Sequence, residues 1–122
     1  MPYFPPIKIM PIYSVRGAKG EDGADGDVGT ASIINKTGSY LATTADNVID
    51  CDATSGAITI TLPTAVGNTG KIYTIKKNDS STNTVTVDAN AAETIDGTLT
   101  KIITTQYTSM TIISDGSNWL II

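Results

Sequence analysis

The chain has 122 residues, a formal net charge of −4 and 40% hydrophobic residues, which fits a single domain with appendages. Histidine is absent and cysteine occurs once, so the usual general base, the commonest metal ligand and an intrachain disulfide are excluded. The lysines are scattered and no apolar run could span a bilayer, so we expect neither nucleic-acid binding nor membrane insertion. A structural or binding protein without a cofactor is favoured over an enzyme.

The composition also predicts the fold class. Thr (20), Ile (17) and Val (6) make up 43 of the residues, whereas Leu occurs only four times. β-Branched side chains favour strands over helices, because they lose rotamer freedom in a helix and pack well on a pleated surface. The sequence therefore predicts an all-β protein.

Residues 1–16 differ from the rest of the chain, because they combine proline with large apolar side chains and lack the features of a signal peptide. Proline favours extended or polyproline II backbone. We expect an extended peptide that docks into grooves of another protein; a disordered tail is the alternative. The expected anchor residues are Pro2, Tyr3, Phe4, Pro5, Pro6, Ile7, Ile9, Pro11 and Tyr13.

Residues 17–31 contain glycine at every third position. The glycines are Gly17, Gly20, Gly23, Gly26 and Gly29. Only glycine fits at the shared axis of three polyproline II-like chains, so this period predicts a short collagen-like triple helix and hence a homotrimer. A flexible linker is the alternative. The tract lacks proline, so we expect a neighbouring part of the chain to impose the trimer.

Residues 32–122 read as a β-rich head domain with six to eight short strands and no helix. We expect loops at 64–70 and 78–83 and turns at 96–97 and 115–118, with 71–77 returning beside 57–63. The architecture predicted is a β-sandwich, a jelly roll or a β-prism. The expected strands are 57–63, 71–77, 84–87, 101–104, 107–114 and 119–122, with weaker candidates at 40–43 and 47–49.

Alternation along these strands predicts which face is buried. One set of faces carries Ile58, Ile60, Leu62, Val85 and Val87, and the opposite faces carry mostly threonine. The final run, WLII, does not alternate, and strands that are apolar throughout are usually covered on both sides. We expect a subunit interface to provide the second cover.

Three aspartates flank the single cysteine. Asp46, Asp50 and Asp52 could supply oxygen ligands to Ca²⁺, but their spacing is not that of an EF-hand, and turns capped by Asx hydrogen bonds are the alternative. We expect Cys51 to be a small buried apolar residue, and no metal site is assigned.

Two aromatic residues are candidates for contact with a receptor glycan. Tyr107 and Trp119 could stack on sugar rings at an exposed tip, although packing in the core is the commoner fate of a single Trp in a strand. The carboxylates are too thinly spread to nominate a glycan-cleaving pair, so no catalytic residue is assigned.

The motifs ITITLPTA, GKIYTIKK, NTVTVD, ETIDG and SDGSNWLII resemble C-terminal head domains of trimeric bacteriophage fibre proteins. The resemblance implies a homotrimer without catalytic residues, whose head is exposed on the virion for contact with a host surface. The short N-terminal segment favours a head fibre that decorates the capsid surface. A receptor-binding tail-fibre tip and a bacterial collagen-like surface adhesin are the alternatives.

Overall fold

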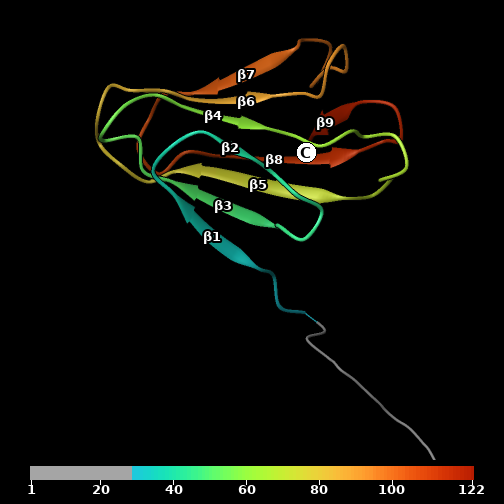
Figure 1. Cartoon of the computed structure of the whole chain (residues 1–122), viewed down its shortest axis with the longest axis horizontal. Coiled ribbons are helices and arrows are strands. Elements are labelled where there is room, and N and C mark those ends of the chain that lie inside the picture. Colours follow the sequence, from blue (N-terminus) through green and yellow to red (C-terminus); the bar gives the residue numbers. More distant parts are fainter. Residues whose placement is uncertain (1–28) are drawn as a thin grey trace, which may run out of the picture. The chain divides into compact units, whose positions relative to one another are not determined.

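The computed structural model describes residues 29–122, of which Ala31–Ile122 form one compact unit (Figure 1). This part of the chain is all-β, as predicted, and contains no helix, hence none that could cross a membrane. Its strands are β1 (Ile33–Lys36), β2 (Tyr40–Leu41), β3 (Val48–Cys51), β4 (Ile58–Thr61), β5 (Ile72–Lys77), β6 (Val85–Asp88), β7 (Thr100–Ile103), β8 (Ser109–Ser114) and β9 (Trp119–Ile121).

The strands form two sheets. The five-stranded sheet has the order β1-β3-β5-β8-β9, and the four-stranded sheet has the order β2-β4-β6-β7. In Figure 1 the four-stranded sheet, with β6 and β7, lies above the five-stranded sheet, with β1, β3 and β5. From β1 to β6 the chain passes from one sheet to the other at every connection.

This winding makes the early strands parallel. β1 pairs with β3 and β3 with β5, while β2 pairs with β4 and β4 with β6, all in parallel. The later strands β7, β8 and β9 add antiparallel pairs. The prediction that 71–77 returns beside 57–63 is wrong, because β4 and β5 lie in different sheets. The mixed sheets also differ from a jelly roll, whose strands are antiparallel.

The core fills the space between the sheets. The five residues predicted for the inner faces, Ile58, Ile60, Leu62, Val85 and Val87, are all at most 1% exposed. From the other sheet come Ile49, Tyr73, Ile75, Ile112 and Trp119, which are completely buried. Apolar residues at every second position of both sheets therefore close on one another and exclude water.

One strand, β1, was not predicted from the sequence. β1 contains a pair of isoleucines but no clear alternation, and it pairs with β3 in the register Ile33↔Val48. Ile34 packs against the core, whereas Ile33 is 67% exposed. The strand thus owes its place to pairing with β3, a long-range interaction that local sequence does not encode.

Both turns marked by an Asp-Gly pair are confirmed. Asp96 and Gly97 have positive φ, and the flanking Ile95 and Thr98 exchange backbone hydrogen bonds of 2.6 and 3.1 Å, as in a type I′ hairpin. At the β8–β9 turn the amide of Asp115 donates to the carbonyl of Asn118, 3.0 Å away.

Gly116 is the turn residue with the tightest surroundings. Its φ is +96°, and a Cβ added there would lie 2.6 Å from Oγ1 of Thr69. We predict that Gly116→Ala lowers the free energy of unfolding by about 1–3 kcal/mol, because left-handed backbone is costly for alanine and Thr69 must move. Gly38→Ala, where an added Cβ meets nothing within 4 Å, should change it by less than about 0.5 kcal/mol. Denaturant titration at one protein concentration measures both; equal losses would contradict the prediction.

Candidate functional site

The expected anchor, 1–16, and most of the G-x-y tract lie outside the described residues. Only Gly29 of the axial glycines is described, and its φ is +90°. Polyproline II backbone has negative φ, so this single chain does not hold triple-helical geometry at that residue.

Tyr107 lies at the surface, in the turn that precedes β8. Its side chain is 65% exposed, and its φ of +66° is held by a hydrogen bond from its amide to the carbonyl of Lys77. Lys76 donates to the carbonyl of Tyr107 over 3.0 Å, and its Nζ lies 5.7 Å from the centre of the ring. An exposed aromatic ring beside a cation is compatible with stacking on a sugar.

Trp119, in contrast, belongs to the core. It is completely buried, and its ring centre lies 5.5 Å from that of Tyr73. The structure does not bring it near the surface with Tyr107, so within this chain only Tyr107 of the pair is accessible to a receptor.

The three aspartates flanking Cys51 have separate partners. Asp46 accepts hydrogen bonds from the hydroxyl of Tyr40 and the amide of Thr43, at 2.9 and 2.8 Å. The first of these contacts raises the pKa of Tyr40. Residues 29–122 contain no group of three or more His, Cys, Asp or Glu side chains placed to hold a metal ion.

Asp50 and Asp52 also have hydrogen-bond partners of their own. Asp50 accepts a hydrogen bond from the side-chain amide of Asn78, 2.7 Å away. Asp52 accepts one from the amide of Thr54 at 3.0 Å, an Asx-type turn, and its contacts with Thr54 lower the pKa of Asp52. The turn interpretation therefore holds for Asp52, whereas Asp50 lies in β3 and Asp46 is buried.

Cys51 is fully buried, as predicted. Burial, followed by the charge of Asp50, raises the pKa of its thiol to about 12. Only the thiolate is an effective nucleophile, so Cys51 is inert at neutral pH while the domain is folded.

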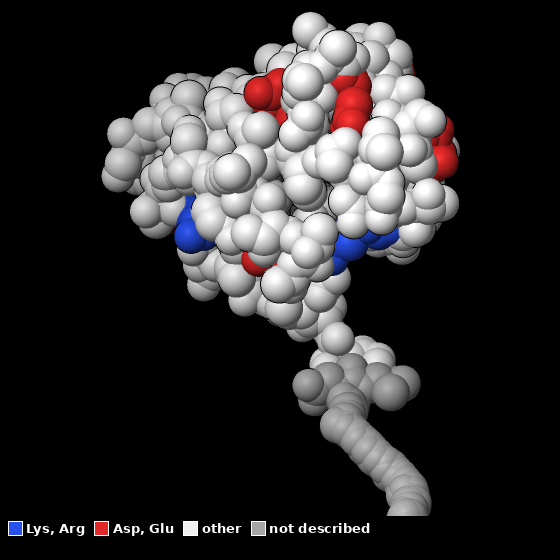
Figure 2. Space-filling model, turned by 45° about the vertical axis from the view of Figure 1, so that its right-hand side comes forward, with Lys and Arg blue, Asp and Glu red and all other residues white. Residues whose placement is uncertain are grey.

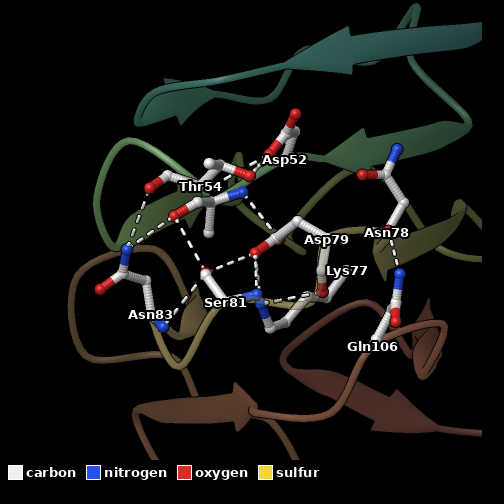
Figure 3. Close-up of polar contacts among 9 residues, drawn as sticks. Asp52, Thr54, Lys77, Asn78, Asp79, Ser81, Asn83 and Gln106 are labelled. Atoms are coloured by element: carbon white, nitrogen blue, oxygen red, sulfur yellow. Dashed lines mark hydrogen bonds and ion pairs between the residues drawn. The ribbon is translucent and has the colours of Figure 1, made fainter.

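The structure shows one polar cluster that the sequence analysis missed (Figure 3). Lys77 ends β5 and is completely buried, with its ammonium 2.8 Å from a carboxylate oxygen of Asp79. That carboxylate also accepts hydrogen bonds from the hydroxyl and the amide of Ser81. The amide of Ala53 donates a further hydrogen bond to it, over 2.8 Å. The contacts with Lys77, then Ser81, hold the pKa of Asp79 far below its usual range.

The alternation of β5 could have revealed this cluster. In the run Tyr73, Ile75, Lys77, every second residue faces the core, so the sequence places a lysine on the inner face. The ends of β3 and β5 meet because these strands are parallel neighbours. The side chain of Asn83 donates to the carbonyl of Ala53 over 2.8 Å and completes a connection between the loops that follow β3 and β5. The cluster thus holds two loops together, since its polar groups bond to one another.

The surface carries both charged and large apolar side chains. Figure 2 shows Asp, Glu, Lys and Arg side chains separated by uncharged surface on the face in view. The exposed large apolar residues are Ile33, Leu41, Val66, Ile72, Leu99, Ile102, Tyr107, Leu120, Ile121 and Ile122. No protein-family model matches the sequence, and no curated protein matches it.

The pKa of Asp79 predicts how acid acts on the domain. A carboxylate whose pKa is lower in the folded state than in the unfolded state stabilises the fold. The full stabilisation is present when the pH lies above the unfolded pKa of about 3.9, and it is lost as the pH falls below that value. We predict that Asp79→Asn lowers the midpoint of thermal unfolding by about 10 °C at pH 7, because Lys77 keeps a buried charge without a counter-charge. The difference from the parent should shrink toward pH 2.

The matched control is Asp115→Asn. Asp115 is exposed, and backbone hydrogen bonds from Asn118 and Ser117 lower its pKa, but it faces no buried cation. Calorimetry between pH 2 and pH 7 should give a smaller loss for this variant. A loss for Asp79→Asn that does not depend on pH would show that the ion pair is not the cause.

Proposed function

We propose that this chain is a structural virion protein: a homotrimeric bacteriophage head fibre that decorates the capsid. Residues 1–16 dock on a capsid protein, 17–31 form a short collagen-like rod, and 32–122 form the head. The protein acts without catalysis and without a cofactor. Its location is the capsid surface, where the head is available to a host-surface glycan.

The observation that carries this proposal is the division of the chain into three compositions in a fixed order. An apolar proline-rich segment precedes five in-register G-x-y triplets, and the compact β unit begins at Ala31, the last residue of the tract. Steric crowding at a triple-helix axis explains the glycine period, and a tract without proline needs a folded domain to bring three chains together.

The length of the rod supports a role as a spacer. Fifteen residues at about 3.1 Å each reach about 45 Å, enough to lift a head domain off a shell. Three peptides that leave a triple helix can splay, so their docking sites need not keep three-fold symmetry. This freedom suits an attachment to five-fold or six-fold capsid positions.

A receptor-binding tail-fibre tip is the second candidate, and the exposed ring of Tyr107 fits it as well as it fits a head fibre. An aromatic side chain that is 65% exposed beside Lys76 is a plausible sugar contact on either type of fibre. The two candidates share the trimer and differ in where the N-terminal segment docks.

Deleting residues 2–13 separates these roles. We predict that the truncated protein stays folded, with the mass of three chains in light scattering, and no longer joins particles, because the apolar contacts to the capsid are gone. The parent should cosediment with fibre-free capsids. As a matched control, Tyr107→Ala should leave capsid binding unchanged.

Two results would overturn the assignment to the capsid. One is a truncated trimer that still decorates capsids. The other is a parent fibre found only at the tail in immunolabelled particles, which would favour the tail-tip alternative. A parent protein with the mass of one chain would overturn the trimer itself.

A further inference from the structure

The two sheets carry different chemistry on their outer faces, the faces that point away from the core. On the five-stranded sheet the outward positions form three rows: two carry large aliphatic residues, and we call these two rows the apolar face, whereas the third is polar and carries Asn35, Asp50, Lys76 and Ser109. The apolar face consists of Ile33, Val48, Ile72, Thr74, Thr111, Ile113, Leu120 and Ile122, placed by alternation and strand register.

Strand register aligns these residues in two rows. Ile72 pairs with Ile113, and Ile113 pairs with Leu120, so three large aliphatic side chains cross β5, β8 and β9 side by side. Ile72 is 43% exposed and Leu120 is 41% exposed. Ile72 on β5 and Ile113 on β8 bring this row onto the inner strands of the sheet, and Leu120 ends it on the edge strand β9.

The second row runs beside the first across the whole sheet. Ile33 pairs with Val48, Val48 with Thr74, and Thr74 with Thr111. The hydroxyls of Thr74 and Thr111 lie 3.0 Å apart and bond to each other, which lowers their demand for water. Ile122 continues the row, since its amide donates to the carbonyl of Thr111, and it is 66% exposed.

The four-stranded sheet presents a polar outer face. Its outward positions on the inner strands β4 and β6 are Thr59, Thr61, Thr86 and Asp88. Its exposed aliphatic residues, Leu41 and Ile102, lie on the edge strands β2 and β7. Threonine hydroxyls and a carboxylate are well suited to water, so only the five-stranded sheet leaves an aliphatic centre uncovered.

The G-x-y tract indicates what covers the apolar face. Ile33 in β1 is the fourth residue after Gly29, and four residues span at most about 14 Å. In the proposed trimer Gly29 exchanges its φ of +90° for triple-helical backbone, so the three chains meet at a common axis there and begin their head domains close to that axis. The first strand they form, β1, belongs to the five-stranded sheet, and its Ile33 lies on the apolar face.

We propose that two further copies of this chain cover the apolar face: three five-stranded sheets face a common three-fold axis, and the threonine faces point outward. The inference rests on the proposed trimer and specifies its interface. Ile72 and Ile113 lie at its centre, because β5 is the middle strand of the sheet and β8 is its neighbour. The unalternating end of the chain, from Trp119 to Ile122, is then covered on both sides.

A charge placed on each face tests this assignment in the full-length protein. Ile72→Lys adds three like charges at the apolar interface, whereas the matched variant Ile102→Lys adds them on the solvent-facing sheet. Both parent side chains are exposed within one chain, at 43% and 57%, so neither change requires burying an ammonium in the core. We expect Ile72→Lys to weaken trimerisation by at least about 30-fold, and Ile102→Lys to leave the mass at three chains.

The reactivity of an introduced cysteine is a second test of the interface, and it does not require disrupting the trimer. Ile72→Cys should react with a maleimide at least about tenfold more slowly than Ile102→Cys. Cys51 provides a silent background, since it is buried and its thiol pKa is raised to about 12. Circular dichroism checks that each variant is folded.

The possible outcomes distinguish a failure of the proposed interface from a failure of the proposed trimer. A parent trimer that survives Ile72→Lys, with Ile72→Cys as reactive as Ile102→Cys, overturns the apolar face while the proposed function stands. Dissociation by Ile102→Lys alone would place the interface on the four-stranded sheet. A monomeric parent would overturn the proposed trimer, and the interface with it.

Discussion

Each sheet of this domain has two faces, and folding of one chain covers only one of them. The inner faces bury Ile60, Val87, Ile75 and Trp119 against each other and account for the core. Burial of apolar area is the main favourable contribution to folding and association. Covering an exposed aliphatic sheet face would therefore lower the free energy further. The threonines of the four-stranded sheet tolerate water; the aliphatic row of Ile72, Ile113 and Leu120 does not. This asymmetry is the basis of the trimer interface that we propose.

The winding of the chain determines which face lies where. Because β1, β3 and β5 are parallel, the loops that follow them lie at the same edge of the sheet. The buried pair of Lys77 and Asp79 connects two of these loops. Removing one partner of a buried pair leaves an uncompensated charge, so the pair specifies the loop arrangement even where its net stabilisation is small. The outer faces remain free for partners.

Local sequence predicted which face of a strand is buried better than it predicted which strands pair. Alternation identified the inner positions of β4 and β6, and the Asp96-Gly97 pair identified a hairpin, because both signals depend on neighbouring residues. The pairing of β5 with β3 instead of β4 depends on long-range packing, which a two-residue period does not encode. Lys77 on the inner face was readable from that period; its partner Asp79 required the loop geometry. The uncovered face of the five-stranded sheet required strand register.

The proposed interface requires a three-fold axis beside the five-stranded sheet, and a cryo-electron microscopy or crystal structure of the full-length protein locates such an axis directly. We predict that the axis runs beside β5 and β8, with the side chains of Ile72 and Ile113 from three copies buried around it and the threonines of β4 and β6 in solvent. An axis that runs beside Thr59 and Thr86, or three heads that make no contact with one another, would contradict the account.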